Sequence, residues 1–188
     1  GGSGIGHSVV EEFIKQGVSI STCDIDKNYI LELRSKYPQI YAEVVDVGDE
    51  LAVKEFCIKS IEFLGGLDCL VNNAGVAGPT SPVEEIDTED WSRCLSVCLS
   101  SQFYFVKSCL NQLRKSSSAS IINISSAAGK HGFALRTPYA SAKWGVIGLT
   151  KSLSIELGKD KIRVNAILPG LVAGDRQQNV LRNKAQKL

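Results

Sequence analysis

Short apolar runs alternate along the chain with longer segments in which apolar residues recur every three or four positions. The short runs predict buried strands at residues 18–23, 40–47, 67–71, 121–124 and 163–168. The longer segments predict amphipathic helices at residues 5–14, 28–37, 49–64, 87–110, 139–157 and 177–188. Such alternation is typical of parallel βαβ units. The pattern therefore predicts an α/β fold with a doubly wound parallel sheet of the Rossmann type, in a single domain spanning residues 1–188.

Glycines and polar residues gather where the predicted strands end. A parallel sheet binds its ligands in a crevice at the carboxyl ends of its strands. We expect one such crevice to be lined by residues 1–6, Asp24, Asp46, residues 72–75, Ser126 and the Pro169-Gly170 pair.

The chain opens on the glycine-rich stretch GGSGIG, which leads directly into the first predicted helix. Such a loop brings backbone N–H groups and the positive end of a helix against a pyrophosphate. Asp24 follows the next predicted strand, where an acidic residue holds the ribose hydroxyls of a dinucleotide. Its charge would repel a 2′-phosphate, so Asp24 favours NAD over NADP. The alternative is that Asp24 caps the helix at residues 28–37.

Ser126, Tyr139 and Lys143 form the candidate acid–base site. Tyr139 and Lys143 are four residues apart on a predicted helix, which turns by about 400° over that distance, so the two side chains share one face. A neighbouring ammonium group favours the phenolate form of a tyrosine. Ser126 directly follows a buried strand and places a hydroxyl at its carboxyl end. The alternative for the Tyr-Lys spacing is an ordinary surface pair.

Composition narrows the class of protein. The chain is 44% hydrophobic with a net charge of +1, so nothing points to nucleic acid or to a membrane surface. The apolar runs are too short to span a membrane. The six cysteines lack C-x-x-C spacing and the two histidines are isolated. We therefore expect a reduced, cytoplasmic protein with buried thiols, without a disulfide framework or a metal site.

Five motifs in this order resemble the short-chain dehydrogenase/reductase family, in its compact branch, over essentially the whole chain. The second half of the family's glycine motif matches Gly4-Ile5-Gly6, and its N-N-A-G motif matches residues 72–75. Its catalytic serine, its Y-x-x-x-K motif and its P-G turn match Ser126, Tyr139 with Lys143, and Pro169-Gly170.

The resemblance implies an NAD(P)-dependent oxidoreductase that interconverts a secondary alcohol and a ketone. Ser126 would hydrogen-bond the substrate oxygen, Tyr139 would act as the acid or base, and Lys143 would bind the nicotinamide ribose and favour the phenolate. The cofactor site implied by the resemblance, together with Asp24, consists of Gly1, Gly2, Ser3, Gly4, Ile5, Gly6, Asp24, Ile25, Asp46, Val47, Asn73, Ala74, Gly75, Tyr139, Lys143, Pro169, Gly170 and Val172.

One departure from the family concerns its V-N-L segment, whose asparagine completes a proton relay. This chain has Val97-Cys98-Leu99, which places Cys98 in the catalytic set, and a thiol is a weak hydrogen-bonding partner. A second hypothesis follows: a dinucleotide-binding scaffold or sensor with little turnover. A third is an NADP-linked reductase of the 3-oxoacyl type, which Asp24 and the absence of a basic residue in GGSGIG oppose.

Three further expectations concern regions around the site. The resemblance implies a central first strand and a last strand that the sequence lacks, so we expect the chain to be incomplete at both ends. It also implies a homodimer or homotetramer through the helices at residues 87–110 and 139–158. Arg136 borders the substrate loop and can bind a carboxylate or phosphate, although such an arginine is more often a surface or interface residue.

Overall fold

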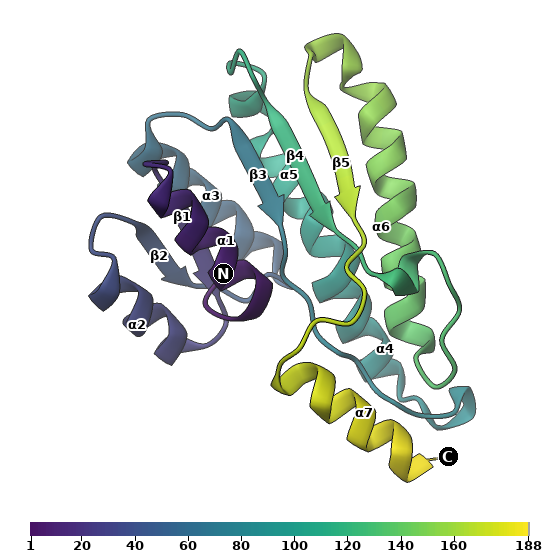
Figure 1. Ribbon diagram of the computed structural model, residues 1–188. Helices are drawn as coiled ribbons and strands as arrows, with labels where there is room; N and C mark the ends of the chain where they lie inside the picture. Colours follow the sequence, from purple (N-terminus) through teal and green to yellow (C-terminus); the bar gives the residue numbers. More distant parts are fainter. Residues whose placement is uncertain (188) are drawn as a thin grey trace.

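The computed structural model describes residues 1–187, with the side chains of residues 175, 176 and 186 left out (Figure 1). The strands are β1 (Ser21–Asp24), β2 (Tyr41–Val44), β3 (Cys69–Asn72), β4 (Ser120–Ile124) and β5 (Arg163–Ile167). The α-helices are α1 (Gly4–Lys15), α2 (Lys27–Lys36), α3 (Glu50–Leu64), α4 (Thr88–Leu95), α5 (Ser101–Leu113), α6 (Thr137–Glu156) and α7 (Asp175–Lys187). The predicted alternation of strands and helices is therefore confirmed, while Leu188 of the last predicted helix lies outside the described residues.

The strands of the described residues form two parallel sheets. β1 pairs with β2, and β3, β4 and β5 pair in that order, with every pairing parallel. Across residues 1–187 no strand joins β1 to β3, so the inner edges of these two strands face a cavity of about 500 Å³. The expectation that the chain is incomplete remains a prediction.

The helices cover the two sheets unequally. α3, α5 and the carboxyl end of α6 contribute to one apolar cluster together with β4 and β5. α1 and α2 pack on the β1–β2 sheet in a second, smaller cluster built around Val10, Ile30 and Ala42. In Figure 1, α1 and α3 lie on opposite sides of β1, and α7 lies beyond the ends to which the strand arrows point.

The helix expected at residues 87–110 contains a break in its hydrogen-bonding pattern. α4 and α5 are joined by a π-helical segment, η2 (Ser96–Ser100), so the helix as a whole runs from Thr88 to Leu113. A π-turn adds one residue to a helical turn and changes which side chains face the neighbouring elements. Cys98 is at the centre of this segment, and its position is therefore set by the π-turn.

Within residues 1–187, no helix combines the length and the apolar composition needed to cross a membrane.

Candidate functional site

Helix α6 positions Tyr139 and Lys143. Pro138 lies in its first turn, where the lack of an N–H group costs nothing. The four-residue spacing brings Lys143 Nζ to 5.7 Å from the centroid of the Tyr139 ring. Lys143 is only 3% exposed, and its Nζ donates a hydrogen bond to the carbonyl oxygen of Ile124 at 2.8 Å. A buried ammonium group is thus held beside the tyrosine by the end of β4.

Ser126 follows β4 and caps a short 3₁₀ turn, η3 (Ala127–Gly129), in which its Oγ accepts a hydrogen bond from Ala128 N at 3.2 Å. The preceding Ser125 Oγ donates to the carbonyl oxygen of Lys143 at 2.8 Å. A Cβ atom on Gly129 would meet Ser125 Oγ at 2.4 Å and the Lys143 carbonyl oxygen at 2.6 Å, so only glycine fits here. The segment that carries Ser126 is therefore packed directly against α6.

The Pro169-Gly170 turn lies at the same edge of the sheet. Ala127 N donates to the carbonyl oxygen of Pro169 at 2.9 Å, which joins the segment after β5 to the segment after β4. Val172, two residues further on, is 47% exposed. The structure therefore brings Ser126 and the Pro169-Gly170 turn together, as the crevice argument expected.

Arg136 is buried, and the expectation of a surface or interface residue is wrong. Its side chain is 7% exposed, and its Nη2 donates to the carbonyl oxygen of Ala77 at 2.6 Å. The guanidinium carbon lies 4.9 Å from the centroid of the Tyr139 ring, so a second cation contacts the same aromatic ring as Lys143. This contact could not be predicted from the sequence, because the loop before α6 has no periodic pattern.

Cys98 is completely buried behind the site. Its Sγ accepts a hydrogen bond from Val76 N at 3.4 Å and donates one to the Val76 carbonyl oxygen at 3.5 Å. Cys98 and Ala142 form a small apolar cluster against which Tyr139 packs. The thiol thus links the π-helical segment to the loop after β3 by hydrogen bonds, and it belongs to the apolar cluster on which the Tyr139 ring packs.

The glycine-rich loop forms the start of α1. The cap residue Ser3 makes no side-chain hydrogen bond to the helix, and Ser3 and Gly4 are exposed, so the first backbone N–H groups of α1 face outward. Gly6 is buried, and a Cβ atom there would lie 2.6 Å from Asn73 Nδ2. The loop and the residues after β3 are therefore in close contact, and this contact requires glycine at position 6. Open N–H groups at a helix start suit an anionic diphosphate.

Asp24 ends β1 and binds the glycine loop. Its Oδ2 accepts a hydrogen bond from Gly2 N at 2.8 Å, and its Oδ1 accepts one from Asp26 N at 3.1 Å. Burial opposes its charge, but hydrogen bonds from the backbone N–H groups of Asp26 and Gly2 favour the carboxylate, and the pKa of Asp24 lies below its ordinary value. The cap of α2 is Asp26, whose side chain accepts from Asn28 N, so the alternative for Asp24 is wrong.

Two expected adenine contacts have other partners in the structure. Arg93 Nη1 lies 3.0 and 2.9 Å from the two carboxylate oxygens of Asp46, and Gly48 N donates to Oδ1 at 2.8 Å. The Val47 side chain is 7% exposed and belongs to the larger apolar cluster. Ile25, by contrast, is 59% exposed beside Asp24. A bound dinucleotide would therefore contact the Ile25 side chain directly. It would reach the Asp46 carboxylate only next to the Arg93 guanidinium group.

A chain of buried amides behind the site was not foreseen from the sequence. Asn72 Nδ2 donates to Asn123 Oδ1 at 2.9 Å, and Asn123 Nδ2 donates to Thr150 Oγ1 at 3.0 Å. Thr150 in turn donates to the Val146 carbonyl oxygen at 2.7 Å. These bonds connect β3, β4 and α6 through the interior. Asparagine in the middle of an apolar strand, as in SIINI, is the signal that indicates such a buried partner.

The arrangement offers proton transfer and anion binding. The Ser126 hydroxyl follows β4, and the buried Lys143 ammonium group lies beside the Tyr139 ring and binds the last carbonyl of the same strand. The exposed start of α1 offers N–H groups that suit an anion. Among the residues that the structure describes, no group of three His, Cys, Asp or Glu side chains is arranged to hold a metal ion.

Comparison with known proteins identifies the family. A family model described as short chain dehydrogenase matches residues 1–185. The chain belongs to the short chain dehydrogenase family. Its fold is accordingly the Rossmann-type α/β fold of these oxidoreductases, as the sequence predicted.

Three similar proteins illustrate the range of this family. The probable galactose dehydrogenase GalD of Rhizobium meliloti (strain 1021) is 36% identical over 189 residues, covering 96% of this short chain dehydrogenase and 72% of GalD. The structure of NAD⁺-bound xylitol dehydrogenase matches with a TM-score of 0.92 and 27% identity, covering 98% of this chain and 73% of that one. The structure of ElxO with NADP bound matches with a TM-score of 0.86 and 29% identity, covering 98% and 75%.

Proposed function

We propose that this protein interconverts a secondary alcohol and a ketone, using NAD in preference to NADP. The observation that carries the proposal is the packing of the Ser126 segment against the helix that bears Tyr139 and Lys143, through the Ser125–Lys143 and Lys143–Ile124 hydrogen bonds. Two hydroxyl groups and one ammonium group at a strand end suit acid–base chemistry on a carbinol or carbonyl oxygen. The names of the relatives, which include sugar dehydrogenases and a dione reductase, support the same chemistry.

Each side chain has one role in this proposal. Tyr139 removes the hydroxyl proton of the alcohol, or returns a proton to the ketone oxygen. Ser126 donates a hydrogen bond to the same substrate oxygen and holds it toward Tyr139. Lys143 keeps a positive charge beside the tyrosine and stabilises the negative charge that develops on its oxygen as the proton moves. Because Lys143 is buried and hydrogen-bonded to Ile124, its ammonium group is already positioned before substrate arrives.

The residues present fit a nicotinamide dinucleotide. The open start of α1 suits its diphosphate, Asp24 and Ile25 border its adenosine ribose, and Lys143 suits its second ribose. When bound, the dinucleotide supplies the hydride acceptor or donor. The preference for NAD rests on the ionised Asp24, whose lowered pKa keeps a negative charge where a 2′-phosphate would lie. Asp24 therefore also opposes the NADP-linked 3-oxoacyl reductase.

The assembly and the compartment belong to the same proposal. Phe103 on α5 and Trp144 on α6 are 47% and 52% exposed, and large exposed aromatic side chains are enriched at protein interfaces. They support a homodimer or homotetramer formed through these helices. The six cysteines are free thiols, which supports a reducing, cytoplasmic location.

One observation favours the second candidate, a dinucleotide-binding scaffold with little turnover. The buried Cys98 thiol forms hydrogen bonds with the backbone of Val76, where the family's relay has an amide. If the wild type binds NADH and is inert on every alcohol while Cys98→Asn turns over, the scaffold describes the protein better than the dehydrogenase.

The experiment is oxidation of a panel of secondary alcohols with NAD⁺, read as NADH absorbance. Ser126→Ala should lower kcat by about 10²-fold, because it removes one hydrogen-bond donor to the reacting oxygen. Ser152→Ala is the matched control, since Ser152 is an exposed serine near the far end of α6. Equal turnover by wild type and Ser126→Ala on an oxidised alcohol would contradict the proposal.

A further inference from the structure

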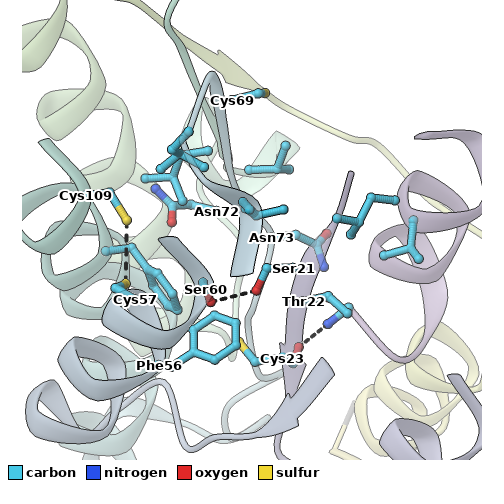
Figure 2. A pocket seen from close by; sticks show the side chains of 18 of the residues that line it. Ser21, Thr22, Cys23, Phe56, Cys57, Ser60, Cys69, Asn72, Asn73 and Cys109 are labelled. Carbon is cyan, nitrogen blue, oxygen red and sulfur yellow. Dashed lines mark hydrogen bonds between the residues drawn. The ribbon is translucent and has the colours of Figure 1, made fainter. Parts of the chain in front are cut away.

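Four of the six cysteines line the cavity between β1 and β3. They are Cys23, Cys57, Cys69 and Cys109. Cys57 comes from α3 and Cys109 from α5, two helices that cover the same face of the sheets and contribute to the same apolar cluster. Figure 2 shows these two side chains pointing toward one another across the wall of the cavity. The candidate active site uses neither of them.

The two thiols are already close to bonding distance. Their Sγ atoms are 3.5 Å apart, and a disulfide needs about 2.05 Å, so the sulfurs must approach by about 1.5 Å. Cys57 and Cys109 are 2% and 4% exposed. Phe56, which directly precedes Cys57, and Phe105, one turn before Cys109, pack edge to face with ring centroids 6.2 Å apart. This contact fixes the two helices on either side of the sulfur pair.

We propose that Cys57 and Cys109 are a reversible oxidation site, which forms an intramolecular disulfide with hydrogen peroxide. The thiolate of one cysteine attacks the O–O bond, giving a sulfenic acid and, after proton uptake, one water. The second thiol then attacks the sulfenic sulfur, forming the S–S bond and releasing a second water. The pair loses two electrons and two protons, and the peroxide is reduced to two waters.

Peroxide is the appropriate oxidant because the site is enclosed. Both side chains are at most 4% exposed, so only an oxidant as small as hydrogen peroxide can approach the two sulfur atoms. The hydrogen bond between the two thiols, together with burial, raises the pKa of Cys57, and the same hydrogen bond lowers the pKa of Cys109. Cys109 is therefore the thiol that more readily supplies the attacking thiolate.

The bridge would also alter stability. Cys57 and Cys109 are 52 residues apart in the sequence, and the loop they close contains β3, α4 and the π-helical segment. A crosslink across a loop of this length restricts the unfolded chain, which raises the unfolding midpoint by roughly 5–10 °C when the folded geometry accepts the bond.

The test treats the wild-type protein with hydrogen peroxide, removes the oxidant, and counts thiols after denaturation. We expect two fewer thiols than the six of the reduced protein, and peptide mass mapping should join the Cys57 peptide to the Cys109 peptide. Dithiothreitol should restore all six. Cys57→Ser and Cys109→Ser should each abolish the bridge, whereas Cys69→Ser, a cysteine lining the same cavity, should retain it.

Peptide mass mapping of the oxidised wild-type protein tests for the Cys57–Cys109 bridge even if a variant fails to fold. A bridge between any other pair of cysteines, or the loss of thiols to sulfinic acids without a crosslink, would overturn the proposal. A Cys57–Cys109 bridge that lowers the unfolding midpoint would overturn the inference that the folded geometry accepts it.

Discussion

The N-terminal region (residues 1–47) and the C-terminal region (residues 69–170) share the same βαβ pattern but are held together by different contacts. In the C-terminal region, buried hydrogen bonds connect β3, β4 and α6 through Asn72, Asn123 and Thr150. In the N-terminal region, α1 and α2 are linked through Glu11, which accepts from Lys36 at 2.8 Å and Tyr37 at 2.9 Å near the surface. Exposed ion pairs contribute little to the free energy of unfolding. Removing one member of a buried hydrogen-bonded network leaves its partner unsatisfied and lowers that free energy.

This difference corresponds to the two proposed tasks. The C-terminal region carries Ser126, Tyr139 and Lys143, whose chemistry needs fixed positions, and its hydrogen bonds are buried. The N-terminal region carries the glycine loop and Asp24, which present a surface to a dinucleotide, and it borders the cavity beside β3. The proposed acid–base group is therefore held more firmly than the proposed cofactor surface. Three pairs of variants test this difference between the two regions.

Of the effects compared between the two regions, the largest is expected for Lys143→Met, which keeps a long side chain but removes the charge. Without the ammonium group beside Tyr139, the negative charge that develops on the tyrosine oxygen during proton transfer loses its stabilising partner, and we expect kcat to fall by about 10²-fold or more. Lys151→Met, an exposed lysine two turns further along α6, should leave kcat unchanged. Steady-state kinetics on an oxidised alcohol measure both. A kcat of Lys143→Met within about 3-fold of the wild-type value would show that turnover does not depend on this charge.

A second effect concerns the free energy of unfolding. Asn123→Ala leaves Asn72 Nδ2 buried without its acceptor, and we expect a loss of about 1–3 kcal/mol. The counterpart in the N-terminal region is Ser21→Ala, which removes the 2.6 Å contact from Ser21 Oγ to Ser60 Oγ in a partly buried place. This change should cost about 1 kcal/mol or less.

Urea unfolding of the two variants measures this difference. A Ser21→Ala cost equal to or above that of Asn123→Ala would remove the contrast in stability between the two regions. Equal slopes of the unfolding curves would show that both losses belong to the same cooperative transition.

The smallest effect is expected at the cofactor surface. Asp24→Asn keeps the hydrogen-bond acceptor for Gly2 but removes the charge, so affinity for NADPH relative to NADH should rise by about 10-fold, or ~1.4 kcal/mol. Glu32→Gln, an exposed carboxylate on α2, is the control and should not alter the ratio. Fluorescence titration with both cofactors gives the ratio. An unchanged preference would discredit the role proposed for Asp24.

Much of this arrangement follows from local spacing in the sequence. The four-residue spacing predicted the shared face of Tyr139 and Lys143, and an apolar run followed by a serine predicted a hydroxyl at the end of a strand. Both depend on residues close together in the chain, for which periodicity is informative. The alternation of elements likewise predicted the parallel α/β fold.

The features that escaped prediction depend on long-range contacts or on one-residue changes of geometry. The π-turn at Cys98 adds a residue to one helical turn without disturbing the apolar pattern. The Arg93–Asp46 pair joins residues 47 positions apart through a long, flexible side chain. The contact of Arg136 with the Tyr139 ring depends on how an irregular loop folds.

The central claim is that Tyr139 transfers the proton in an alcohol–ketone interconversion. The most direct measurement compares wild type with Tyr139→Phe for NADH affinity and for turnover of an alcohol that the wild type oxidises. The account predicts similar NADH affinity, within about 3-fold, and a loss of kcat of about 10³-fold, because the ring remains and only the hydroxyl is removed. Equal turnover by the two proteins, with NADH bound to both, would contradict it.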